Sequence, residues 1–429
     1  MALHPFVTSF SRYFGGLLAL AGSLSAGSLI LDHAESQRIA AQPHQFGFNL
    51  AIMKQIADHD MDWAHPDVRE ATERMNPRMI RWPGGSTSNN YLWRDETYAE
   101  AVGDITGWVP GHVNAFIASG KKLGLQVFID YCNEYGITPI YVYNSFEGDG
   151  QDLVDFVQHV EDRGGRVLYL EFANEPYWDP RALNDVEPYL AATRPLAAAL
   201  KAFRPATQIG ICFAPHGNSA NYEKIWNAPL MAEPYFDAVV HHEYHGKQGL
   251  GLEETDDLVL QAFTHPEPVF EQMAASLASE APGYPVWLTE YNIGWDHLPE
   301  FAYTGAHGMY IASIFAWLNE HGDQFPIANF HQFYQDGFGT FLLDDETLEK
   351  HYTASFFVWK LLGDISRDAT HVLPIPSGTI DLVVMAYASP EAISYLIVNK
   401  SGDARDLTFE YHGELMANAW TGEQIAYPD

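Results

Sequence analysis

The sequence predicts a (β/α)8 TIM barrel followed by a small C-terminal β-sandwich. Between residues 45 and 368, segments with the alternating, β-branched and aromatic pattern of strands take turns with segments of helical periodicity, and this unit recurs eight times. Regular alternation of this kind favours a parallel barrel, for which about 250 residues or more are typical. Across 369–429, short strands separated by Pro, Gly, Asn and Asp replace the alternation, and this pattern is typical of an all-β domain.

The segments of the barrel follow one another in a strict order. The long helical pattern at 112–135 is expected to break near Gly124, because glycine weakens a helix interior. The expected strands are 45–51, 79–81, 137–144, 167–172, 208–215, 236–245, 286–292 and 327–334; the expected helices are 66–75, 112–135, 151–163, 185–203, 223–230, 267–280, 304–321 and 352–364; the sandwich strands are expected at 383–387, 393–398, 407–411 and 415–420.

Residues 1–27 have the pattern of an export signal. Arg12 precedes an apolar, small-residue run at 14–26, which is too short to span a bilayer. Its removal would leave a lead-in segment, 28–44, whose apolar stretch 28–31 is suited to a strand of the sandwich. We therefore expect a secreted or periplasmic protein, with no membrane segment in its mature form. The alternative is that the apolar run leads directly into the first strand.

Composition and charge narrow the class of partner. The chain of 429 residues is 47% hydrophobic and 14% aromatic, which excludes a disordered or fibrous protein. Its formal charge of −33 would repel nucleic acid and anionic membranes. It also favours a neutral polysaccharide over a sulfated or uronic one. The two cysteines, Cys132 and Cys212, are expected to be separate buried thiols because one falls on a predicted helix and the other on a predicted strand.

Two of the predicted strands end in a glutamate. The strand 167–172 runs into Asn174-Glu175-Pro176, where proline prevents a central strand from continuing. The strand 286–292 carries Glu290 near its end. Strands four and seven of a barrel face each other across its mouth, so these carboxylates can approach to the separation of about 5 Å that a retaining glycosidase requires.

The other strand ends are polar as well, and the functional residues of a TIM barrel gather at these ends. Arg81 and Tyr244 are the expected partners that keep Glu290 ionised, and Asn174 is placed to donate to a sugar hydroxyl. Glu171 lies on the same face of its strand as Glu175, one layer deeper, and is expected to pair with Arg81. The expected substrate-binding residues are Arg81, Asn49, Asn144, Asn174, His242 and Tyr244 at strand ends, with Trp178 and Trp295 as stacking platforms in loops.

No metal or other cofactor is expected. Residues 241–245 read His-His-Glu-Tyr-His on a predicted strand, without the His-Glu-x-x-His spacing of a helical zinc site. Strand alternation sends His242 and Tyr244 to one face and their neighbours to the other. The segment 83–86, Pro-Gly-Gly-Ser, lacks the features of a phosphate-binding loop and predicts a tight turn below the pocket.

Five segments together resemble the clan-A retaining glycoside hydrolases, and most closely the α-L-arabinofuranosidase branch. The resemblance implies a barrel with a β-sandwich, in which Glu175 is the acid/base and Glu290 the nucleophile. It places Arg81, Asn174, His242 and Tyr244 around them. Two positions depart from that branch: Pro176 follows Asn-Glu, and Tyr291 stands where Trp is common. The segments are FGFN (46–49), RWPGGSTSNNYLW (81–93), YLEFANEP (169–176), DAVVHHEY (237–244) and TEYN (289–292).

We therefore expect a retaining glycosidase that acts on a plant or algal polysaccharide by double displacement, with arabinofuranosides as the first substrate class. Asn-Glu-Pro and Thr-Glu-Tyr-Asn also resemble certain endo-acting glucanases of the clan, and the Pro-Gly-Gly turn is shared with agarase or porphyranase-type enzymes and heparanase-like glucuronidases. The alternative is thus an endo-acting β-glycanase of the β-1,4-glucanase or agarase type. A carbohydrate-binding barrel without catalysis is the third interpretation. The expected partner is a polysaccharide or oligosaccharide, and the oligomeric state is open.

Overall fold

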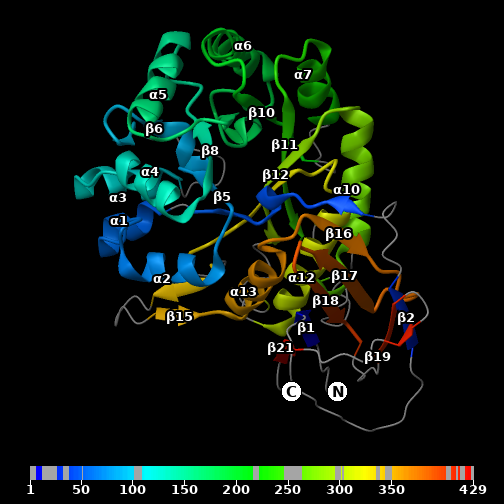
Figure 1. Ribbon diagram of the computed structural model, residues 1–429. Helices are drawn as coiled ribbons and strands as arrows, with labels where there is room; N and C mark the ends of the chain where they lie inside the picture. Colours follow the sequence, from blue (N-terminus) through cyan, green and yellow to red (C-terminus); the bar gives the residue numbers. More distant parts are fainter. Residues whose placement is uncertain are drawn as a thin grey trace.

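A computed structural model describes residues 6–11, 27–31, 38–50, 52–100, 109–215, 222–245, 263–294, 301, 304–334, 339–343, 350–401, 407–411, 414–415 and 421–426. Its main body is a closed barrel of parallel strands, in the order β4-β5-β8-β9-β10-β11-β12-β13 and back to β4 (Figure 1). The predicted TIM barrel is confirmed. The barrel strands are β4 (Gly47–Asn49), β5 (Met79–Trp82), β8 (Thr138–Tyr143), β9 (Tyr169–Phe172), β10 (Gln208–Cys212), β11 (Ala238–His245), β12 (Val286–Ile293) and β13 (Ile327–Phe330).

Helices cover the outside of this barrel and agree closely with the predicted segments. The predicted break at Gly124 is present, since that residue adopts φ 74° between two separate helices, α3 and α4. The helices that follow the strands are α1 (Met53–His59), α2 (Pro66–Met75), α3 (Val109–Ser119), α4 (Leu125–Tyr135), α5 (Gly150–Asp162), α6 (Val186–Phe203), α7 (Ala228–Ala232), α10 (Glu267–Glu280), α12 (Gly305–Glu320) and α13 (Ala354–Ser366), with a π-helical segment at Glu223–Asn227 before α7.

Helix α5 illustrates how the local sequence specifies these elements. Its N-cap, Asp149, accepts hydrogen bonds from the backbone N–H groups of Gln151 and Asp152, which satisfies donors that have no partner within the helix. Its buried residues recur at three- and four-residue spacing and form one apolar face toward the barrel. They are Leu153, Phe156, Val157 and Val160.

A second domain of β-sheets follows the barrel, as predicted. Its larger sheet has the order β21-β1-β18-β17-β16-β3, and a three-stranded sheet has the order β2-β19-β20. Of the predicted strand 415–420, only Leu415 is among the described residues, and 416–420 lie outside them. The strands are β1 (Phe6–Ser11), β2 (Gly27–Leu31), β3 (Ile39–Ala40), β16 (His371–Pro374), β17 (Leu382–Ala388), β18 (Ile393–Asn399), β19 (Leu407–Tyr411), β20 (Glu414–Leu415) and β21 (Thr421–Ala426).

Three strands of this domain, β1, β2 and β3, come from the N-terminal region. Strand β2 runs parallel to β19, in agreement with the predicted role of 28–31. Strand β1 falls within the predicted export signal and pairs with both β18 and β21. Export stays a prediction.

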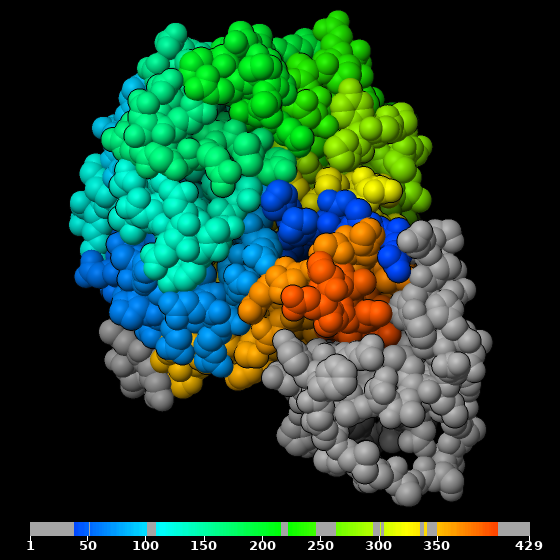
Figure 2. Space-filling view, viewed as in Figure 1, coloured from blue at the N-terminus to red at the C-terminus, as the bar shows by residue number. Residues whose placement is uncertain are grey.

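The β-domain packs directly on the barrel. Strand β3 connects the two by pairing with β16, and in Figure 2 the blue surface of the first described residues of the barrel lies beside the orange surface of the C-terminal part of the chain. Tyr387 of β17 stacks on Phe315 of α12 with ring centroids 6.3 Å apart.

No helix in the described part of the chain is long and apolar enough to cross a membrane. Cys132 and Cys212 are free, buried thiols, as predicted.

Candidate active site

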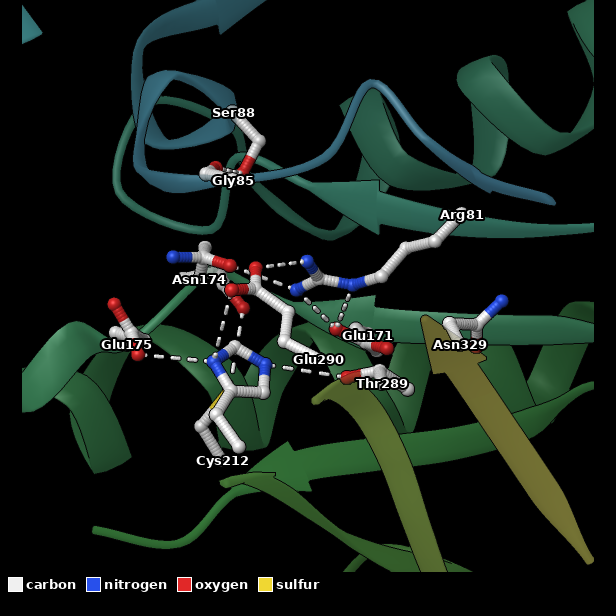
Figure 3. Close-up of polar contacts among 12 residues, drawn as sticks. Arg81, Gly85, Ser88, Glu171, Asn174, Glu175, Cys212, Thr289, Glu290 and Asn329 are labelled. Atoms are coloured by element: carbon white, nitrogen blue, oxygen red, sulfur yellow. Dashed lines mark hydrogen bonds and ion pairs between the residues drawn. The ribbon is translucent and has the colours of Figure 1, made fainter. Parts of the chain in front are cut away.

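A single arginine connects the polar strand ends at the mouth of the barrel. Arg81 at the end of β5 is fully buried and donates to Glu171 Oε2 from Nε and Nη2, at 3.0 and 2.7 Å (Figure 3). Its Nη1 donates to Glu290 Oε1 at 2.7 Å and to Asn49 Oδ1 at 3.1 Å. Its Nη2 also donates to Asn174 Oδ1 at 2.8 Å. The predicted pairing with Glu171 is therefore present, and one guanidinium orients four side chains that come from three other strands or their ends, β4, β9 and β12.

The charge of this arginine is stabilised by its partners. Burial by itself lowers the pKa of Arg81, but the carboxylates of Glu171 and Glu290 outweigh burial and raise it above its usual value. Arg81 is thus a permanent cation between two buried carboxylates, the arrangement in which removing one partner is most costly.

Glu290 is held in its ionised form. It is 5% exposed on β12, and its Oε2 accepts a 2.6 Å hydrogen bond from the Tyr244 hydroxyl. Burial raises its pKa. His242 and His331, which are both protonated in the acid range where Glu290 titrates, together with Arg81 and the Tyr244 hydrogen bond, lower it from 4.5 to about 2. A buried carboxylate that accepts such bonds stays anionic at neutral pH.

Glu175 faces Glu290 from the end of β9. Its Oε1 lies 2.9 Å from His242 Nδ1 and 3.4 Å from the Tyr177 hydroxyl, which donates to it. Oxygen atoms of Glu175 and Glu290, together with a ring nitrogen of His242, all lie within 4.8 Å of one another. The two predicted carboxylates therefore converge.

His242 connects the two glutamates. Its Nδ1 lies 3.8 Å from Glu290 Oε2, and its Nε2 lies 3.2 Å from Thr289 Oγ1. Burial lowers the pKa of His242, but Glu290 and Glu175 outweigh burial and raise it above the usual value. His242 and Tyr244 both face the site while His241 contacts Glu243 instead, as strand alternation on β11 predicted.

The backbone that presents Glu175 differs from the predicted strand face. Alternation was expected to place Glu175 on the same strand face as Glu171, but β9 ends at Phe172. Ala173 and Glu175 adopt left-handed conformations with φ of 60° and 43°, so the chain turns here. Glu175 reaches the site through that turn.

The three predicted asparagines have different surroundings. Asn174 contacts Arg81 through its oxygen, and its Nδ2 lies 3.4 Å from Ser86 Oγ. Asn49 is fully buried. It donates to the backbone oxygen of Thr289 and accepts from Arg81, so it helps to orient the guanidinium. Asn144 donates to the backbone oxygen of Tyr91 and lines another cavity.

That other cavity lies beside the hairpin of β6 (Tyr91–Leu92) and β7 (Thr97–Tyr98). It is lined by residues that include Trp82, Trp93 and Asn144, and by neither Glu175 nor Glu290. Of the predicted stacking platforms, Trp178 is partly buried against the core, with its ring 5.4 Å from that of Tyr177. Trp295 lies outside the described residues.

Sequence reasoning assigned no role to three further residues of the site. Thr289 contacts His242, and His331 Nδ1 lies 3.7 Å from Glu290 Oε2. Burial lowers the pKa of His331 to about 4, so it is neutral at pH 7. Asn89 contacts the backbone of Asn174. The position of His331 at the end of a barrel strand was the available signal, whereas Asn89 lies in a loop.

The predicted tight turn at 83–86 is also present, with Gly84 and Gly85 at φ of 77° and 66°, which glycine adopts without strain.

Glu175, His242 and Glu290 are the one group of described residues whose ligand atoms are close enough to hold a metal ion. The nearby cation of Arg81 and the raised pKa of His242 oppose a further positive charge there.

No protein-family model matches this sequence, and no curated protein matches it either. Solved structures do resemble it. A family 51 α-L-arabinofuranosidase from Bifidobacterium longum has a TM-score of 0.69 and 16% identity, covering 90% of this chain and 88% of that one. An α-L-arabinofuranosidase from Thermotoga maritima has a TM-score of 0.65 and 16% identity, covering 93% and 95%. A family 39 β-xylosidase from Caulobacter crescentus has a TM-score of 0.51 and 14% identity, covering 91% and 84%. These likenesses establish the fold: a TIM barrel with an accompanying β-sheet domain.

Proposed function

We propose that this protein is a retaining glycoside hydrolase. The observation that carries the proposal is the pair of glutamates at the barrel mouth, whose oxygens lie within 4.8 Å of one another. This fits the separation of about 5 to 5.5 Å in retaining enzymes, whereas inverting enzymes leave room for a water at about 6.5 to 9.5 Å. The different surroundings of the two carboxylates support different roles for them.

In the first step Glu290 attacks the anomeric carbon, and Glu175 donates its proton to the leaving oxygen. The low pKa of Glu290 keeps the nucleophile anionic, and Arg81 and Tyr244 orient both of its oxygens. In the second step Glu175 accepts a proton from water, which attacks the glycosyl-enzyme and regenerates Glu290. Asn174 is oriented through its oxygen by Arg81, and its amide N–H₂, which lies 3.4 Å from Ser86 Oγ, is the donor that we assign to a sugar hydroxyl.

The substrate that we propose is an α-L-arabinofuranoside of a plant or algal polysaccharide. The sequence segments around both glutamates and the two arabinofuranosidase structures support this choice. A neutral sugar is favoured because the guanidinium of Arg81 is already paired with two carboxylates and the whole chain is acidic.

Product release from a panel of neutral and anionic polysaccharides, resolved by chromatography, tests this proposal. Release of arabinose alone would support it, and a ladder of oligosaccharides would favour the endo-acting β-glycanase. Sugar binding without any product would favour a non-catalytic barrel. The variant Glu290→Gln serves as the control in each case.

Replacing Glu175 by Gln should impair substrates according to their leaving group. General acid catalysis contributes on the order of 10² to 10⁴-fold, so kcat/KM for phenyl arabinofuranoside should fall by about that factor. The 2,4-dinitrophenyl glycoside should be cleaved to its glycosyl-enzyme at nearly the normal rate, because its leaving group needs no proton. Burst kinetics would measure this step. Equal losses on both substrates would contradict the acid/base role.

Replacing Tyr244 by Phe should move the acidic limb of the pH profile. Burial raises the pKa of Glu290, and the Tyr244 hydrogen bond is one of the contributions that lower it. Loss of that bond raises this pKa, so the nucleophile becomes protonated at a higher pH and the acidic limb of kcat/KM shifts upward. Tyr291→Phe is the matched control, since this buried hydroxyl has no hydrogen-bond partner among the described residues. An unchanged limb in Tyr244→Phe would argue against Glu290 as the nucleophile.

A further inference from the structure

The turn that carries Glu175 is conformationally costly. Ala173 and Glu175 both adopt left-handed backbone conformations, which cost roughly 1–2 kcal/mol for each non-glycine residue. Between them, Asn174 contributes a side chain to the site. Such a turn persists only if surrounding groups hold it.

Asn89 supplies these contacts to the backbone of Asn174. It lies on a 3-10 segment, Ser86–Asn90, and is 3% exposed. Its Oδ1 accepts from the backbone N–H of Asn174 at 2.7 Å, and its Nδ2 donates to the backbone oxygen of Asn174, also at 2.7 Å. A carboxamide has one acceptor and one donor group side by side, so Asn89 binds both backbone groups of Asn174, which belong to the peptide units on either side of that residue.

Asn89 is itself held by Asp179 and Arg181, through hydrogen bonds additional to those with Asn174. Its Nδ2 lies 3.2 Å from Asp179 Oδ2. Arg181 donates from Nη2 to the backbone oxygen of Asn89 at 2.9 Å and to Asp179 Oδ2 at 2.8 Å. The side chain of Asn89 therefore has little freedom to rotate, and the loop 86–90 is tied to the segment that follows Glu175.

We propose that Asn89 is a positioning residue, which holds the left-handed turn at 173–175 so that the Glu175 carboxyl meets the glycosidic oxygen. This inference rests on the proposed function. Proton transfer requires the acid within hydrogen-bond reach of the leaving oxygen, and a misplacement of about 1 Å can cost on the order of 100-fold. The contact between Glu175 and His242 at 2.9 Å reports the held geometry.

Asn89→Ala and Asn89→Asp test the inference through leaving-group dependence. The alanine variant loses both bonds to Asn174, and the aspartate variant loses the donor and places a carboxylate next to Asp179. In both, kcat/KM for phenyl arabinofuranoside should fall on the order of 100-fold, while the 2,4-dinitrophenyl glycoside should lose less than about 5-fold, since it needs no acid. Asn90→Ala is the matched control, because it changes the neighbouring residue of the same 3-10 segment and leaves both bonds from Asn89 to Asn174 in place; it should lose neither activity.

A second measurement does not depend on turnover. NMR titration of the His242 imidazole, assigned with His242→Gln, should show a lower pKa in both Asn89 variants, because the contribution of Glu175 weakens when the turn relaxes. Equal kinetic losses on the two glycosides, or an unchanged His242 titration, would overturn the positioning role. If the unaltered protein cleaves no glycoside, the proposed function fails, and the titration alone then decides whether Asn89 holds the turn.

Discussion

Replacing Glu290 by Gln should reduce turnover on the order of 10⁴-fold or more, since loss of the group that forms the covalent intermediate removes the mechanism itself. Glutamine has nearly the same shape and can still accept the hydrogen bond from Arg81 Nη1. The variant should therefore fold, and the loss should appear in kcat rather than in substrate affinity. Initial rates on native polymer and on an aryl glycoside would measure it, with thermal unfolding as the control for folding.

Glu290→Ala, assayed with added azide, would assign the roles of the two glutamates. Azide that occupies the place of the missing nucleophile attacks the anomeric carbon from that face, so the glycosyl azide has inverted configuration. In Glu175→Ala, azide instead replaces the water of the second step and yields a product of retained configuration. The opposite pairing of configurations would exchange the two roles. Normal activity of Glu290→Gln on native polymer would reject the mechanism altogether.

The strand ends were predictable because each depends on local sequence. Strand patterns that stop at a proline or a glycine turn identified Arg81 and Asn174, and the strand pattern 286–292 identified Glu290 near its end. The barrel topology then brought the three residues together. The partner of Arg81 was predictable for an energetic reason: Glu171 on a buried face requires a cation. Both arguments need only periodicity and the cost of burying charge.

The parts of the site that were missed depend on tertiary contacts. Ala173 carries no sequence signal for a left-handed conformation, so the turn before Glu175 was read as continued alternation. Asn89 acts on the backbone of Asn174, 85 residues further along the chain, and local sequence patterns do not predict such a long-range contact. Asn144 was grouped with the site because it ends a barrel strand, yet its amide turns toward the hairpin at Tyr91. A strand end specifies the rim of the barrel but not the direction of the side chain.

Replacing Arg81 by Met should destabilise the protein by about 3–5 kcal/mol at neutral pH, the typical cost of breaking a buried ion pair from one side. The methionine fills much of the volume, but Glu171 and Glu290 are left as buried carboxylates without their shared cation. The loss of the cation should destabilise the Glu171 carboxylate more than that of Glu290, because Glu171 Oε1 already lacks a hydrogen-bond partner among the described residues. Denaturant unfolding at pH 7 would measure the change in the free energy of unfolding.

The pH dependence and a second substitution separate charge from packing in this variant. Without Arg81 the pKa of Glu290 rises, because the charge of Arg81 is one of the contributions that lower it. Protonation then neutralises this buried carboxylate as the pH falls, and the deficit in stability relative to the unaltered protein should shrink toward pH 4. Adding Glu171→Gln to Arg81→Met should restore part of the lost stability at neutral pH, since it removes one uncompensated charge. A deficit that is constant with pH and unaffected by Glu171→Gln would mean that Arg81 stabilises the barrel through packing. In that case the guanidinium of Arg81 would not be the group that organises the charges at the mouth of the barrel.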